Sequence, residues 1–73
     1  MAMRAIPFPA SSQIADIQYD DEATDLIVTF AKGGVYKYQA VPSDLADGFT
    51  NALSAGRYLN AYIKNLYEYE KIG

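Results

Sequence analysis

Ser54, Gly56 and Arg57 form the segment of this chain whose residue types and spacing most favour binding chemistry. A helix that begins at Ser54 offers free backbone N–H groups, Gly56 lets another group come close, and Arg57 adds a planar cation. Together they predict a site for a phosphate or a carboxylate. The structural alternative is that Ser54 only caps the helix, Gly56 only permits tight packing, and Arg57 pairs with an acid or stacks on a tyrosine.

Seven tyrosines in 73 residues supply large apolar faces that also carry a hydroxyl. Tyr36 and Tyr38 are two residues apart on one face of a predicted strand, and Tyr58 and Tyr62 are four apart on a predicted helix. Such surfaces stack on nucleotide rings, form protein interfaces, or simply pack in a core. The candidate ligand-binding residues are therefore Tyr36, Tyr38, Ser54, Gly56, Arg57, Tyr58 and Asn60.

The composition removes several classes of site. The chain has no cysteine and no histidine, which excludes disulfides, thiolate metal sites and the commonest general base. The acidic residues at 20–25 favour a solvated turn over a calcium or magnesium loop, and Gly33 with Gly34 favours a hairpin over a phosphate-binding loop. We expect no catalytic residues, no metal and no cofactor.

The charge balance bears on partners. Six Lys and Arg stand against nine Asp and Glu, giving a formal charge of −3 and a pI near 4.5. This sign argues against binding along a phosphate backbone. Because no stretch approaches the ~20 apolar residues of a membrane span, we expect a cytoplasmic protein that does not contact membranes.

Strand patterns dominate the first half of the chain. Residues 13–20 are rich in β-branched and aromatic side chains, residues 26–30 alternate apolar positions, and residues 35–39 alternate Tyr36 and Tyr38 with Lys37. Polar residues at 20–25 and the pair Gly33–Gly34 provide the two turns between them. These ranges predict a three-stranded antiparallel meander.

Two helices are predicted after Pro42, which ends the third strand. Ser43 with Asp44 favours the first helix start, and its apolar stripe comprises Leu45, Phe49, Ala52 and Leu53. Gly48 in its middle either permits a close contact between helix and sheet or marks a weak, short helix. The second helix starts at Ser54, and its stripe comprises Tyr58, Leu59, Tyr62, Ile63 and Leu66.

Both ends of the chain are predicted to be extended. Residues 1–10 form an N-terminal arm constrained by Pro7 and Pro9, with Ile6 and Phe8 lying on an apolar surface of this subunit or another, or in a partly ordered tail. Residues 67–72 alternate as a short terminal strand or an extended wrap. The expected fold is α+β: a three-stranded antiparallel meander followed by two helices packed on one face, with residues 11–73 as a single domain.

Ordered sequence pieces across 11–66 resemble the KTSC family, a region also found at the C-terminus of some lysyl-tRNA synthetases and as a small bacterial or phage protein. The pieces are Ser11-Ser12 with Ile14, Ile17-x-Tyr19-Asp20, Leu26-x-Val28-x-Phe30, Gly33-Gly34-Val35-Tyr36-x-Tyr38 with Val41-Pro42, and Ser54-x-Gly56-Arg57-Tyr58-x-Asn60 with Ile63. The resemblance implies a small β-meander with helices and no agreed enzymatic activity. Leu59 replaces a frequent Phe, and Glu68 and Glu70 stand in a region that is commonly more basic, which argues against an inherited contact with tRNA or DNA.

We therefore expect a non-catalytic binding module of phage or prophage origin. Its ligand is a small nucleotide-like anion, with sequestration of a host signal as one role, or a partner protein. The alternatives are an RNA- or DNA-binding accessory module and a virion or assembly component. Because the core of so short a chain is thin, we also expect a homo-oligomer.

Overall fold

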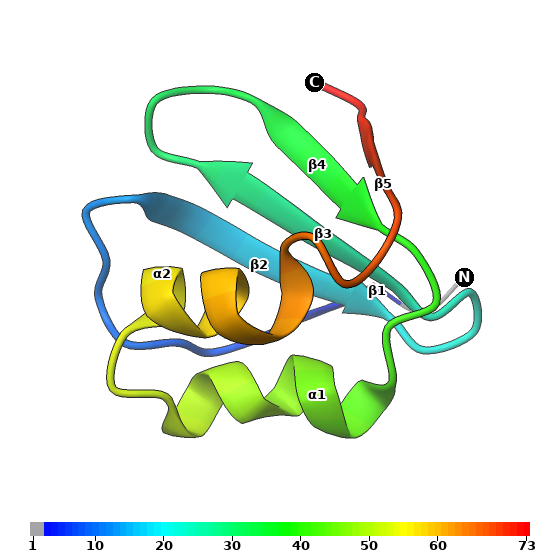
Figure 1. The fold of residues 1–73 in the computed structure, drawn as a ribbon, viewed down its shortest axis with the longest axis horizontal. Helices are drawn as coiled ribbons and strands as arrows, with labels where there is room; N and C mark the ends of the chain where they lie inside the picture. Colours follow the sequence, from blue (N-terminus) through cyan, green and yellow to red (C-terminus); the bar gives the residue numbers. More distant parts are fainter. Residues whose placement is uncertain (1–2) are drawn as a thin grey trace.

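Alternating apolar residues build the three central strands of the sheet. In the computed structural model, which describes residues 3–73, these strands are β2 (Ile14–Asp20), β3 (Asp25–Phe30) and β4 (Val35–Tyr38) (Figure 1). Gly33 and Gly34 both adopt positive φ angles, of 103° and 97°, in the hairpin between β3 and β4. The predicted meander and its glycine turn are therefore confirmed.

Two further strands extend the sheet beyond the predicted three. β1 (Met3–Ala5) pairs with β2, and β5 (Tyr69–Lys71) pairs with β4, so the antiparallel order is β1-β2-β3-β4-β5. The prediction of a three-stranded sheet undercounts it. β5 is the terminal strand that the alternation at 67–72 allowed, whereas β1 lies within the predicted arm.

The rest of the arm packs on its own subunit. Ile6 is buried and donates its backbone N–H to the carbonyl of Ile17, 2.9 Å away, while Phe8 packs against the core. The Thr50 hydroxyl donates to the carbonyl of Pro7 over 2.8 Å. The arm therefore bridges the sheet and the helical layer. Residues 1–2 of the predicted arm lie outside the described residues.

One row of paired residues crosses the helix-covered face of the sheet. Tyr19 pairs with Leu26 and Leu26 with Tyr38, and the row ends at Arg4 on β1 and Tyr69 on β5. The inner three side chains are buried, and the Tyr19 hydroxyl donates a hydrogen bond to the backbone carbonyl of Val41. The core continues from this row into the helical layer through Phe49, Leu59 and Ile63.

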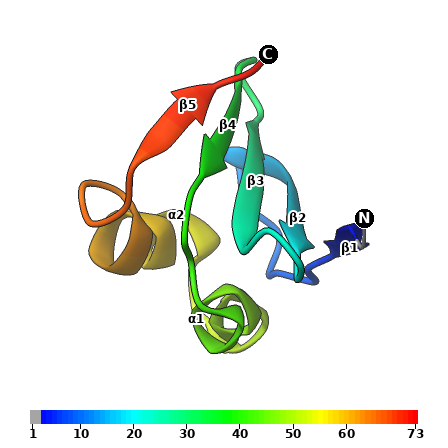
Figure 2. The same ribbon diagram turned by 90° about the vertical axis from the view of Figure 1, so that its right-hand side faces the viewer.

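Each predicted helix is shorter than expected and changes geometry partway. α1 (Ser43–Asp47) continues as a 3₁₀ helix, η1 (Gly48–Asn51), and α2 (Ala55–Tyr58) continues as a π-helix, η2 (Leu59–Ile63). Both segments lie on the same side of the sheet (Figure 2). The predicted packing face is confirmed for Phe49, Leu59 and Ile63, which are buried.

Leu53 departs from the predicted stripe. Ala52 ends η1 with an extended backbone (φ −73°, ψ 147°), so the helical spacing that grouped Leu53 with Phe49 no longer applies. Leu53 is fully exposed, with a relative accessibility of 101%. Tyr62 and Leu66 of the second predicted stripe are also exposed. Leu66 lies beyond the end of the helix at Ile63, and the Tyr62 ring packs against Tyr58, with centroids 4.9 Å apart.

Gly48 sets the distance between the two helical segments. A β carbon at this position would lie 2.0 Å from the Tyr58 hydroxyl oxygen, so only glycine lets the Tyr58 ring approach η1. The ring centroids of Tyr58 and Phe49 are 4.5 Å apart. The close contact at Gly48 is therefore made with the second helix and not with the sheet as predicted. The predicted alternative of a short helix agrees with the end of α1 at Asp47.

Two classes of feature are not found among residues 3–73. No helix there has the length and apolar character needed to cross a bilayer, and no three acidic side chains gather into a metal-binding group. In the acidic turn after β2, the Asp20 carboxylate accepts hydrogen bonds from the N–H groups of Glu22 (2.9 Å) and Ala23 (3.1 Å). This carboxylate therefore stabilises the turn itself.

Candidate functional site

The start of α2 is fixed by its capping residue. Ser54 has an extended backbone, and its Oγ accepts a hydrogen bond from the N–H of Arg57 over 3.3 Å. The first turn then closes with the Tyr58 N–H donating to the Ser54 carbonyl over 3.0 Å. Ser54 is thus the predicted helix cap, and Arg57 lies in the first turn that it caps.

A second serine fixes the loop that faces this helix start. The Oγ of Ser11, between β1 and β2, accepts hydrogen bonds from the backbone N–H groups of Gln13 (3.1 Å) and Ile14 (3.2 Å). The Gln13 side chain reaches the first turn of α2. A β carbon on Gly56 would lie 2.2 Å from Gln13 Oε1, so the loop and the helix meet in close contact there.

A concave pocket of about 320 Å³ lies between this loop and the helix start. Four of the predicted site residues, all from one short segment, line one side of it. The other side is a loop more than 40 positions earlier in the chain. The residues that line it are Ala10, Ser11, Ser12, Gln13, Leu53, Ser54, Gly56, Arg57 and Asn60.

Arg57 is the charged residue of the pocket. Its side chain is exposed and makes no ion pair or hydrogen bond within residues 3–73, and no carboxylate is among the lining residues. By contrast, Arg4 and Lys37 each form ion pairs with acidic side chains outside the pocket. Arg57 therefore retains its full capacity to bind an anion.

The two capping serines add hydrogen-bond donors. A hydroxyl has one donor and two acceptor lone pairs. Both lone pairs of Ser11 Oγ are used by backbone N–H groups, and one of Ser54 Oγ is used by Arg57 N. Neither hydroxyl donates a hydrogen bond within the described part of the chain. Ser11 can therefore act toward a ligand only as a donor, and Ser54 remains free to donate.

The three predicted tyrosines lie outside this pocket. Tyr38 is buried in the core, and Tyr36 packs between Phe30 and Tyr69 at centroid distances of 5.4 and 5.5 Å. Tyr58 donates its hydroxyl proton to the carbonyl of Leu45 over 2.7 Å, and burial raises its pKa. The structure therefore does not join the tyrosines to Arg57 in one site; it uses them for packing.

Ser11, Ser12 and Gln13 are the pocket residues that the sequence did not assign to the site. Ser11 and Ser12 were named only among the pieces that resemble the KTSC family, and Gln13 only as the first residue of a predicted strand. The pair Ser11-Ser12 ahead of the strand carries the signal of a loop with side-chain caps, but it does not indicate which distant segment it faces.

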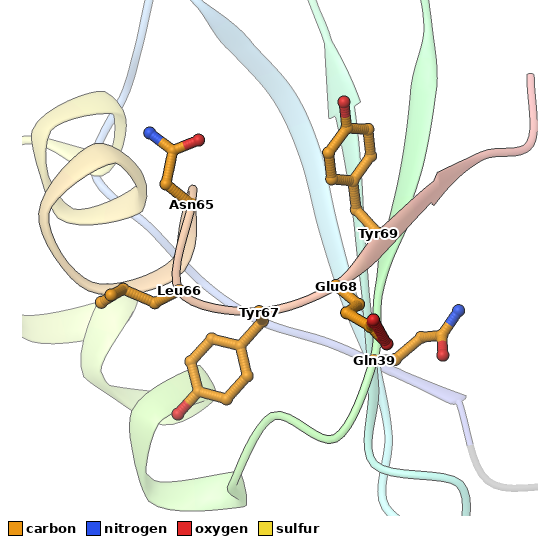
Figure 3. Close-up of a pocket in the computed structure, with 6 residues that line it drawn as sticks. All are labelled: Gln39, Asn65, Leu66, Tyr67, Glu68 and Tyr69. Carbon is orange, nitrogen blue, oxygen red and sulfur yellow. The ribbon is translucent and has the colours of Figure 1, made fainter.

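A second hollow lies beside β5 and was not predicted. It measures about 520 Å³ and is lined by Gln39, Asn65, Leu66, Tyr67, Glu68 and Tyr69. Figure 3 shows that these side chains point in different directions and do not converge on a common point. Because a binding site needs a few convergent polar groups, the pocket around Arg57 is the better candidate.

Comparison with known proteins identifies several relatives. The chain is 31% identical over 64 residues to lysine–tRNA ligase of Nostoc punctiforme and 33% identical over 64 residues to that of Trichormus variabilis, covering 88% of this chain in each case. It spans only 11% of the length of those ligases. It is also 36% identical over 63 residues to a protein of Stutzerimonas stutzeri, covering 85% of this chain and 89% of that protein.

A solved structure has the same fold. The crystal structure of a KTSC domain protein from Yersinia pestis matches with a TM-score of 0.88 and 35% sequence identity, over 99% of this chain and 100% of that one. The family model described as the KTSC domain matches residues 10–69, which include the whole pocket. The chain therefore belongs to the KTSC domain family.

Proposed function

We propose that this chain is a non-catalytic binding module that holds an anionic group in the pocket between the β1–β2 loop and α2. The observation that carries the proposal is the set of unused donors: the unpaired guanidinium of Arg57 and the hydroxyls of Ser11 and Ser54. Binding without turnover would sequester a small ligand, or would hold the domain on a larger molecule that carries the anionic group.

The donor set defines the chemistry of the ligand. A guanidinium and a hydroxyl whose lone pairs are occupied both require acceptors, and an ionised phosphate or carboxylate offers only acceptors. The Gln13 and Asn60 amides supply both donors and acceptors at the same pocket. Nucleotide phosphates, free carboxylates and acidic side chains of proteins share this chemistry.

The test is a titration of the purified protein with inorganic phosphate, AMP and acetate, followed by thermal shift and calorimetry. A ligand at 100 times its Kd stabilises the folded state by about 2.7 kcal/mol, which is readily detected. Arg57→Ala should abolish the shift. Lys64→Ala removes an exposed cation outside the pocket and is the matched control, with binding expected to be unchanged. Equal loss in both variants, or binding that survives Arg57→Ala, would refute the proposal.

A second candidate function is contact with RNA. It is favoured by the match to a segment of lysine–tRNA ligases, proteins whose name states an action on tRNA. Arg57 and Lys64 would contact phosphates, whereas Lys37 already lies 3.6 Å from Glu70. Fluorescence anisotropy with tRNA at low and physiological salt separates the candidates, because contact with several phosphates makes affinity fall steeply with salt. No binding at low salt would rule this candidate out.

A further inference from the structure

Leu53 gives the candidate pocket an apolar rim. It lies between η1 and α2, where Ala52 and Ser54 are both extended, and its side chain is fully exposed while lining the pocket. The backbone on both sides is held, by the Ala52 N–H donating to Phe49 O (3.2 Å) and by the Ser54 cap. The backbone that carries this aliphatic side chain is thus anchored on both sides, in the same pocket as an unpaired cation.

The rings that could stack on a nucleobase face elsewhere. Tyr36, Tyr38 and Tyr58 make their ring contacts with Phe30, Tyr69, Phe49 and Tyr62, and none of them lines the pocket. The apolar contact at the pocket comes from the aliphatic side chains of Leu53 and Ala10. Aliphatic groups suit another aliphatic side chain, whereas single-stranded bases are held mainly by aromatic stacking.

We infer that the occupant is a segment of a partner protein in which an Asp or Glu is flanked by aliphatic residues. This inference rests on the proposed function. The carboxylate complements Arg57 and the Ser11 and Ser54 hydroxyls, and an adjacent aliphatic side chain packs on Leu53. A free phosphate would bind only the hydrogen-bond donors and would leave the Leu53 side chain exposed to water.

The experiment compares two peptides that share one carboxylate, by calorimetry on the full chain. The probes are Ac-Leu-Glu-Leu-NH₂ and Ac-Gly-Glu-Gly-NH₂, with inorganic phosphate and AMP titrated alongside. The leucine peptide should bind about tenfold more tightly than the glycine peptide, as expected from burying roughly two methylene groups. In Leu53→Ala the ratio should fall to about one. Leu66→Ala removes an exposed leucine outside the pocket and should keep the tenfold ratio.

The outcomes separate this inference from the function on which it rests. Equal affinity for both peptides, with phosphate bound through Arg57, overturns the inference and leaves the proposed function standing. AMP binding more tightly than phosphate and than both peptides also overturns it, in favour of a nucleotide. A tenfold ratio that persists in Leu53→Ala overturns it because the apolar contact would lie elsewhere. If neither peptide nor either phosphate binds, the proposed function fails as well.

Discussion

The side-chain amide of Gln13 rests on the α carbon of Gly56, so that a β carbon there would lie 2.2 Å from Gln13 Oε1. This contact joins the loop after β1 to the first turn of α2. It forms the junction from which the candidate pocket opens, because both residues line it. The pocket therefore depends on the packing of these two segments, which are distant in the sequence, against each other.

Gly56→Ala is predicted to alter the pocket more than the stability. Gly56 does not have a positive φ, and the nearest atom is the end of a flexible, exposed side chain that can move aside. We expect a free energy of unfolding within about 1 kcal/mol of the wild type, since alanine also favours the helix. Affinity for inorganic phosphate should fall, because the displaced amide enters the pocket.

The double variant Gln13→Ala/Gly56→Ala tests this explanation of Gly56. Removing the Gln13 amide removes the clash, so the double variant should bind phosphate as Gln13→Ala alone does. Chemical denaturation and calorimetry provide the two readouts. A Gly56→Ala variant that is strongly destabilised, or whose binding the second substitution does not change, would contradict the predicted displacement.

Gly48→Ala is predicted to destabilise the fold. The new methyl group would lie 2.0 Å from the Tyr58 oxygen and 2.7 Å from Tyr58 Cζ, and Tyr58 is held by the Leu45 carbonyl and the Phe49 ring. Overpacking of this kind costs about 1–3 kcal/mol. Urea denaturation measures the cost, and Asn51→Ala, at an exposed position of the same 3₁₀ helix, is the control. Equal stability of the two variants would show that Tyr58 can move freely.

The sequence predicted the centre of the sheet because its signals there are local. The ranges 26–30 and 35–39 and the glycine turn between them agree with β3, β4 and their hairpin. β1 was missed because Met3–Ala5 is a three-residue edge strand next to Pro7, and so short a segment carries no readable alternation. Leu53 was misplaced because helical spacing assumes a continuous helix, whereas the chain is extended at Ala52.

The site was predicted in part for the same reason. Ser54, Gly56, Arg57 and Asn60 lie within seven positions, so one helix start brings them together. Ser11, Ser12 and Gln13 join them only through the tertiary fold. The tyrosines were assigned by residue type, which does not separate a binding platform from a core. Strand pairing across β3, β4 and β5 places Tyr36 and Tyr38 in packing roles, and Tyr58 packs on Phe49 within the helical layer.

Arg4 is predicted to hold β1 by a salt-sensitive contact. Its guanidinium lies 2.7 Å from Asp21 and 2.8 Å from Asp47, joining the first strand to the β2–β3 turn and to α1, and hydrogen bonds to Asp21 and Asp47 raise its pKa. These side chains are about half exposed, so solvent and salt screen the pairs. Arg4→Met should lower the melting temperature at low ionic strength, and the difference from wild type should shrink as salt is added. Hydrogen exchange of the β1 amides should be faster in Arg4→Met than in wild type, and this difference should also shrink as salt is added. A melting difference independent of salt would assign the effect to packing of Arg4 on the Tyr19 ring, 5.4 Å away.

The stability of the fold should decline in alkali because of its buried tyrosines. Burial raises the pKa of Tyr19 above its ordinary value of 10.0, with a further contribution from Asp21, and burial also raises the pKa values of Tyr38 and Tyr58. The folded state thus retains these protons longer than the unfolded chain does. The resulting stability is fully present below about pH 10 and is lost as the pH rises through the folded-state values.

Urea denaturation at several pH values from about 8 to 11, with phenolate absorbance recorded in parallel, measures this alkaline loss. Tyr19→Phe removes one of the titrating groups together with its hydrogen bond to Val41. The variant should be less stable than wild type at neutral pH, and its free energy of unfolding should fall less steeply above about pH 10. A slope identical to that of the wild type would mean that the Tyr19 phenol ionises equally easily in the folded and unfolded chains. That result would contradict the effect expected from its burial in the core.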